Sequence, residues 1–390
     1  MVRTDSWRGR IALMAGHCAG MIDLVALPVW VGALIAHYGF DPQQAGGLVT
    51  LFLAGAVLAS VMLAPRFGRL NGRVVAACGF GVAAAAFAAA AQTRGFGALA
   101  ALHVLAGLAA GSALSVTHGT LARSANPHRQ FALVNFALGV FAILFLGGTP
   151  KLIEAAGAPM LFVVFAAVMA VGALLGALAF PVLPPAVVLP ASGAPQGAPR
   201  RFPPAVWAGI FAIFCMGLVQ SMTFAFLERA GADRGYGVAQ ITGVLIALGF
   251  VNLLPAPLAA WLQHRLRARG VLIAGPLVQA AVCALIMTRS SFQVYAAAAC
   301  VFAAIIIFTH TFAFGLLARL EPSGRALAAT PAMLMVGAAI GPILGGTFVK
   351  FAGYGAIAVV AAGLGLGAAV AVAALVPAQA RQAHVARRAA

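Results

Sequence analysis

The chain has 390 residues, of which 63% are hydrophobic and 8% charged, and its formal net charge is +17. A soluble domain carries about 25% charged residues, and a chain this apolar cannot bury its hydrophobic surface in its own interior. Composition therefore excludes a soluble protein. A high positive charge is also typical of nucleic-acid-binding proteins, but the apolar segments leave no basic soluble domain for that function, so we expect no nucleic acid partner.

Twelve apolar segments follow one another along the chain. A helix needs about 20 apolar residues to cross the hydrocarbon core of a bilayer, and each segment is close to that length. The sequence therefore predicts an all-α polytopic membrane protein with twelve transmembrane helices. The predicted spans are 11–36, 45–64, 74–91, 97–121, 131–152, 159–180, 205–226, 238–262, 271–287, 294–317, 326–349 and 355–376.

The long segment 181–204 is rich in proline and small residues, which is typical of a linker. It divides the chain into two halves with six predicted spans each. We expect an N-terminal six-helix bundle at 1–180, a cytoplasmic linker at 181–204 and a C-terminal six-helix bundle at 205–390. Two equal halves indicate an internal repeat, which is common in secondary transporters.

Positive charge alternates between the two sides of the predicted topology. With the N-terminus inside, all but six of the 24 lysine and arginine residues fall on the cytoplasmic side. Cytoplasmic loops of membrane proteins carry such an excess, so both termini are predicted to be cytoplasmic in a multi-pass protein of the cell membrane. The same charge attracts anionic lipid headgroups. The six exceptions are Arg94, Lys151, Arg229, Arg234, Arg289 and Lys350.

Motifs for catalysis or metal binding are missing from the sequence. It contains no H-E-x-x-H pair, no phosphate-binding P-loop and no nucleophile with a matching base. All five cysteines lie in apolar segments, where they are expected to be small buried side chains. We therefore predict neither an enzyme nor a protein with a metal or cofactor.

The loop after the second span, A-P-R-F-G-R-L-N-G-R, resembles the cytoplasmic loop signature G-x-x-x-D-R-x-G-R-R of the major facilitator superfamily (MFS). Arg66, Gly68 and Arg69 match its arginine, second glycine and following arginine. The resemblance implies that these three residues take part in gating. Pro65 replaces the aspartate of the signature, so the charge contact that this aspartate supports in the family is in doubt.

Two glycine-rich spans extend the resemblance. In the fourth span, His103 stands where the family has an arginine followed by spaced glycines. Residues 337–346 of the eleventh span, G-A-A-I-G-P-I-L-G-G, resemble the pattern associated with antiporters, which the family carries in its fifth span. Gly341 and Pro342 are therefore predicted gating residues. Glycines at this spacing also allow close helix packing, which is compatible with gating.

Asp23 is the only acidic residue inside a predicted span, and it lies near the middle of that span. Ionisable side chains at membrane depth are costly and usually functional. A carboxylic acid that binds and releases a proton as access alternates would couple transport to a proton gradient. The alternative is a permanently protonated aspartate that hydrogen-bonds to a neighbouring helix.

Other unusual polar and aromatic residues fall in spans four, seven and ten, which together with span one line the cavity in the MFS. The resemblance thus predicts a substrate-binding set, although each histidine could also simply satisfy an interhelical hydrogen bond. The predicted set is His103, Ser115, His118, Gln220, Phe224 and His310.

These features predict a secondary active transporter that moves a small organic solute by alternating access, with proton coupling and export favoured. No lysine or arginine lies in mid-span, which argues against a dicarboxylate or phosphate. Three alternatives stay open: proton-coupled uptake of an organic or aromatic acid, a non-transporting membrane sensor, and a lipid-moving protein. The expected partners are the solute, protons and membrane lipids, and we expect a monomer.

Overall fold

A computed structural model describes residues 4–63, 70–181, 202–321 and 325–376. Arg66, Gly68 and Arg69 lie outside these residues, so their predicted gating role stays a prediction. The described residues form fifteen helices: α1 Trp7–Gly20, α2 Ile22–Tyr38, α3 Pro42–Leu63, α4 Gly72–Ala90, α5 Phe96–Ala122, α6 Pro127–Ala156, α7 Pro159–Ala179, α8 Pro204–Ala225, α9 Leu227–Asp233, α10 Val238–Val251, α11 Pro255–Leu262, α12 Ala268–Thr288, α13 Phe292–Leu320, α14 Arg325–Ala352 and α15 Tyr354–Leu375.

Twelve stretches of the described chain are long and apolar enough to cross a membrane, which confirms the predicted all-α polytopic fold. Three of the spans contain a break. The first span consists of α1 and α2, the seventh of α8 and α9, and the eighth of α10 and α11. Each break leaves backbone groups at a helix end without partners in their own helix.

Local sequence explains several helix ends. Proline is the first residue of α7, α8 and α11, where its missing N–H removes no helical hydrogen bond. Asn71 caps α4 by accepting hydrogen bonds from the backbone N–H groups of Arg73 and Val74. Gly39 ends α2 with a φ of 70°, a left-handed conformation that side chains with a Cβ rarely adopt.

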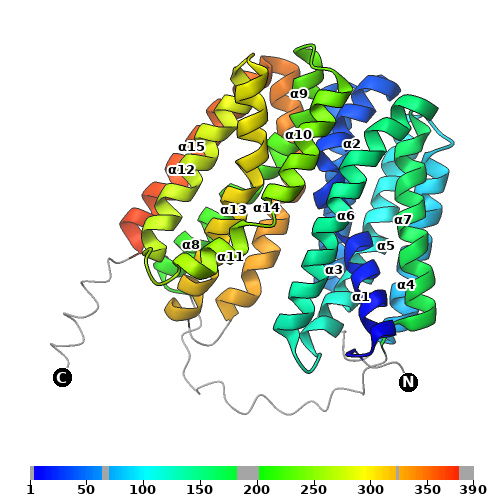
Figure 1. Cartoon of the computed structure of the whole chain (residues 1–390), viewed down its shortest axis with the longest axis horizontal. Helices are drawn as coiled ribbons and strands as arrows, with labels where there is room; N and C mark the ends of the chain where they lie inside the picture. The colour runs from blue at the N-terminus through cyan, green and yellow to red at the C-terminus, as the bar shows by residue number, and fades with distance from the viewer. Residues whose placement is uncertain (1–3, 64–69, 182–201, 322–324, 377–390) are drawn as a thin grey trace.

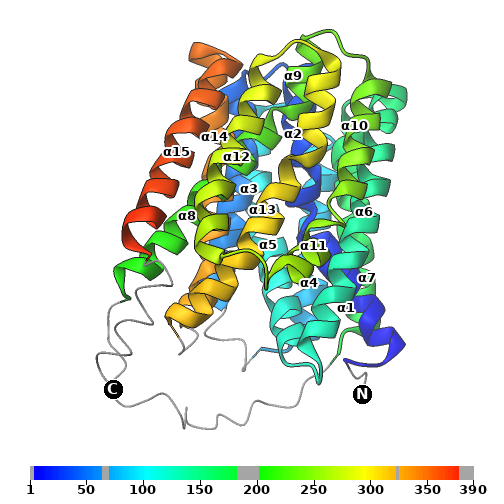
Figure 2. The same ribbon diagram turned by 60° about the vertical axis from the view of Figure 1, so that its left-hand side comes forward.

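The helices form two groups that lie side by side (Figure 1). We call α1–α7 the first half and α8–α15 the second half. The basal end is the end where α1 and α8 begin and α15 ends; the apical end is the opposite one, where α2 ends and α3 begins. Figure 2 shows the molecule turned by 60°, with the second half coming forward over part of the first half. The division into folding domains at 1–180 and 205–390 stays a prediction.

Glycines bring α5 close to α3 within the first half. A Cβ on Gly107 would overlap the backbone of Phe52, and one on Gly111 would lie 2.5 Å from the Cα of Ala56. Only glycine permits this approach, which is how small residues pack helices in membranes. The glycines of the fourth span therefore act in packing.

Candidate functional site

Asp23 lies at the break in the first span. Helix α1 ends at Gly20, and Asp23 is the second residue of α2. The first N–H groups of a helix have no partner in their own helix. The Asp23 carboxyl group lies beside the first backbone N–H groups of α2, those of Asp23 and Leu24. The side chain is half-buried, and no side chain of the described residues bonds to it. The carboxyl group therefore retains free acceptor positions in mid-span.

His103 lies in the aromatic interior of the first half. It is fully buried, and its ring centroid is 5.6 Å from that of Trp30 and 5.5 Å from that of Phe162. Its Nδ1–H donates a hydrogen bond of 2.7 Å to the carbonyl of Leu99, whereas its Nε2 has no partner within the described ranges. The structure thus separates His103 from the other residues of the predicted binding set.

His118 pairs with a residue that the sequence analysis did not group with it. The Nε2 of His118 on α5 lies 3.0 Å from the Nδ1 of His17 on α1, so one ring donates a hydrogen bond to the other. Ser115, one turn earlier on α5, has its hydroxyl oxygen 2.8 Å from the carbonyl oxygen of Gly111 and 3.0 Å from the hydroxyl oxygen of Ser60 on α3, and its one hydrogen is shared between them. Periodicity within one helix cannot reveal such pairs between helices.

The second half contains a pair of buried glutamines. Gln279 on α12 donates through Nε2 to the Oε1 of Gln220 on α8 at 3.1 Å. Phe224, one turn after Gln220, is buried on the same helix. Gln279 is not in the predicted binding set, although a glutamine in an apolar span is a usable signal. His310 on α13 bonds to a carbonyl of its own helix one turn earlier at 2.8 Å. The structure thus brings together Gln220, Gln279 and Phe224.

Hydrogen bonds between described residues of the two halves gather at the apical end. They join the start of α3, with the turn before it, to α14. The three main pairs are Asp41–Lys350 at 3.0 Å, Gln43–Thr347 at 3.2 Å and Thr50–Ile343 at 3.2 Å. Toward the basal end the two groups of helices diverge (Figure 1). The structure is therefore closed at the apical end.

Asp41 and Lys350 form the ion pair of this closure. Slight burial alone would raise the pKa of Asp41, but the backbone N–H of Gln44 and the ammonium group of Lys350 together hold that pKa below its ordinary value. Both side chains are about one third exposed, so the pair contributes little energy and can break readily.

Close backbone contacts complete the apical closure. A Cβ on Gly46 of α3 would overlap the carbonyl of Pro342, and a Cβ on Gly346 of α14 would overlap the carbonyl of Pro42. Gly341 instead faces Ser221 of α8, within the second half. Of the two gating residues predicted in span eleven, Pro342 therefore lies at the contact between the halves and Gly341 does not.

Comparison with known proteins identifies the class. The family model described as Major Facilitator Superfamily matches residues 12–322. The chain belongs to the major facilitator superfamily. No curated protein matches the sequence. As a member of the MFS, the protein is a multi-pass membrane transporter of the secondary type that acts on a small-molecule substrate, and it is not an enzyme.

Several solved structures share the fold of this MFS member. A mutant of the nucleoside transporter NupG is 14% identical, with a TM-score of 0.75, and the match covers 94% of this chain and 100% of that one. Unmutated NupG is 16% identical, with a TM-score of 0.72 and coverages of 95% and 99%. A bacterial homologue of the human lysosomal transporter Spinster, described as inward-facing and unoccupied, is 15% identical, with a TM-score of 0.67 and 95% coverage of both chains.

Glu228 adds a second acidic residue to the interior of this MFS transporter. The predicted seventh span ends at 226, which places Glu228 near the membrane interface. The structure continues the span through α9 to Asp233. The Oε2 of Glu228 is buried and has no hydrogen-bond partner among the residues that the structure describes, and a Cβ on Gly32 of α2 would overlap it. Glu228 therefore lies in the contact between the two halves.

Proposed function

We propose that this transporter couples the export of a small uncharged organic solute to proton entry by alternating access. The observation that carries the proposal is Asp23, a half-buried carboxyl group in a mid-span helix break with no side-chain partner among the described residues. Such a group can bind a proton in one conformation and release it in another, because no side chain of the described residues is bonded to its charged form.

The polar and aromatic residues of the second half are suited to an uncharged solute. Gln220 and Gln279 supply amide groups that both donate and accept hydrogen bonds, and Phe224 supplies an aromatic ring close by. No lysine or arginine lies in mid-span to hold a carboxylate or phosphate. Nucleosides fit this chemistry, and the similar NupG structures belong to a nucleoside transporter, so nucleosides belong in any solute panel.

The apical contacts support alternating access. They consist of a few hydrogen bonds and close backbone contacts between α3 and α14, and the ion pair among them is partly exposed. Separating these surfaces costs little compared with unfolding either half. Pro342 contributes its carbonyl to this contact, and the pattern around it resembles the antiporter pattern of the family, which favours export.

Proton release from purified protein tests the coupling. In weak buffer with a pH indicator, uncharged solutes, including nucleosides, are added one at a time to wild type, Asp23→Asn and Glu154→Gln. Glu154 is an exposed acid near the apical end of α6 and serves as the matched control. A substrate should release protons from wild type and from Glu154→Gln but not from Asp23→Asn. Equal release from all three proteins would remove Asp23 from the mechanism.

The direction of coupling is tested in liposomes with an imposed pH gradient. An antiporter drives its solute toward the acidic side, whichever way the protein is inserted. A symporter drives it away from the acidic side.

One observation favours a second candidate, the uptake of an organic acid. The His17–His118 pair would form an anion site when both rings are protonated. In the same liposomes, this candidate predicts that an organic acid moves away from the acidic side and that His118→Gln abolishes the movement. That result would favour uptake over the first proposal.

A further inference from the structure

The break in the eighth span lies beside a groove in the surface of the second half. Helix α10 ends at Val251, and α11 begins at Pro255, whose ring cannot continue the hydrogen bonds of α10. An apolar groove of about 660 Å³ lies between these helices, α12 and α13. We call it the apolar groove. Its lining includes Leu254, Leu258, Val278 and Phe308, and the first of these is 62% exposed.

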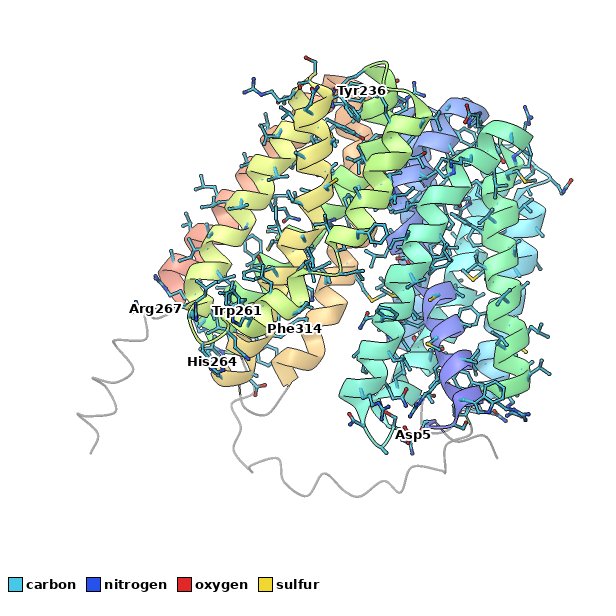
Figure 3. All side chains as sticks on the ribbon, viewed as in Figure 1. Asp5, Tyr236, Trp261, His264, Arg267 and Phe314 are labelled. Carbon is cyan, nitrogen blue, oxygen red and sulfur yellow. The ribbon has the colours of Figure 1, made fainter. Side chains whose placement is uncertain are left out.

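A basic cavity of about 530 Å³ adjoins the apolar groove at the basal end. We call it the basic cavity. Both are lined by Leu266 and Arg267, so they form one continuous surface. The basic cavity is also lined by His264, Arg265 and Arg319, and no acidic residue in the described part of the chain contributes to its lining. Figure 3 shows Trp261, His264, Arg267 and Phe314 together at this end of the second half.

The arginine side chains of the basic cavity are available to bind an anion. In the described part of the chain, Arg267 and Arg319 form no ion pair, and Arg265 lies over the ring of exposed Trp261 at 5.1 Å. Arg267 also directly precedes α12, and no side chain of the described residues caps the first N–H groups of that helix. Free guanidinium groups beside a helix N-terminus favour an anion such as a phosphodiester.

We propose that the apolar groove and the basic cavity together bind one anionic phospholipid of the basal leaflet. Its phosphate lies against Arg267 and Arg319, and one acyl chain occupies the apolar groove. Every membrane helix contacts lipid, but an ordinary lipid-facing surface does not join an apolar groove to a cavity with several arginines and no acid. In the predicted orientation this leaflet is cytoplasmic, where basic segments attract anionic lipids.

Lipid titration followed by native mass spectrometry tests the headgroup contact. The full chain in neutral detergent is titrated with phosphatidylglycerol and with phosphatidylcholine of the same acyl chains. We expect one tightly bound phosphatidylglycerol and much weaker phosphatidylcholine binding. Arg267→Gln and Arg319→Gln should each weaken phosphatidylglycerol about fivefold. Arg129→Gln makes the same charge change at an exposed site in the first half and should leave binding unchanged.

A second pair of variants tests the acyl chain. Ala274 lines the apolar groove and is exposed, so Ala274→Phe should fill the groove and weaken phosphatidylglycerol without changing charge. Ala362→Phe adds the same ring at an exposed site on α15 and should have no effect. Equal binding of both lipids by every variant would overturn the proposal, since it would show ordinary surrounding lipid only. Full displacement of phosphatidylglycerol by soluble glycerol phosphate would also overturn it, because the site would then bind a free anion.

Discussion

Replacing Gly46 by alanine should shift the transporter toward a state that is open at the apical end. In the closed structure the new Cβ would overlap the Pro342 carbonyl and lie 2.7 Å from its carbon, and backbone atoms cannot rotate away as a side chain can. Overpacking of this kind costs about 1–3 kcal/mol. Because the cost arises only where α3 meets α14, it should favour the apical-open state by about 5- to 150-fold.

The neighbouring glycine provides the control. A Cβ on Gly47 would lie 3.8 Å from Ile343, which is an ordinary contact. Both substitutions gain the same helix propensity, about 1 kcal/mol, so their difference reports the contact between the halves. Spin labels at Gln92→Cys and Ser290→Cys, in a background without reactive native cysteines, measure the apical separation of the two halves. Equal distance distributions for Gly46→Ala and Gly47→Ala would refute the reasoning.

Two further predictions use the same labels. The Asp41–Lys350 pair stabilises the apical-closed state above the ordinary pKa of aspartate, and this stabilisation is lost as the pH falls through the lowered pKa of Asp41. Acidification below about pH 4 should therefore favour apical opening by ~0.2–1 kcal/mol, and Lys350→Met should abolish this pH dependence. Glu228→Gln should increase the apical-closed population, because an amide does not place a charge in the buried contact with Gly32, whereas Glu154→Gln should leave the population unchanged.

Hydropathy was sufficient to predict the twelve spans, because membrane crossing depends on length and apolar content, which the sequence shows directly. The breaks were harder to predict. Pro255 was a visible signal for the break in span eight, but Met21 and Phe226 interrupt spans one and seven without a proline. Those breaks depend on how neighbouring helices pack, and a single hydropathy profile does not record that packing.

The site was only partly predictable for the same physical reason. Span four places His103 on one stripe with its glycines, yet the glycines face α3 while His103 faces the rings of Trp30 and Phe162. One face of a helix is wide enough to contact more than one neighbouring helix, and periodicity does not show which helix each residue contacts. Only the folded structure pairs His118 with His17 on a different helix.

The seventh span shows how local charges can conceal a membrane span. Several charged residues follow Phe226 and lower the local hydropathy, and the predicted span ends there. In the structure three of these residues have local partners: Arg229 pairs with Asp233 at 2.7 Å, and Arg234 donates to two carbonyls of α12. Helix α9 can therefore continue the span and hold Glu228 in the buried contact.

Asp23 and Glu228 each follow a helix break. Each is the second residue of the helix that follows the break, in the first span of its half. Their surroundings differ, because Asp23 is half-buried while the Oε2 of Glu228 is sealed against Gly32 by the apical closure. The two amide variants should therefore have separable effects. Asp23→Asn should abolish proton release while leaving the apical distances unchanged, whereas Glu228→Gln should change the distances themselves.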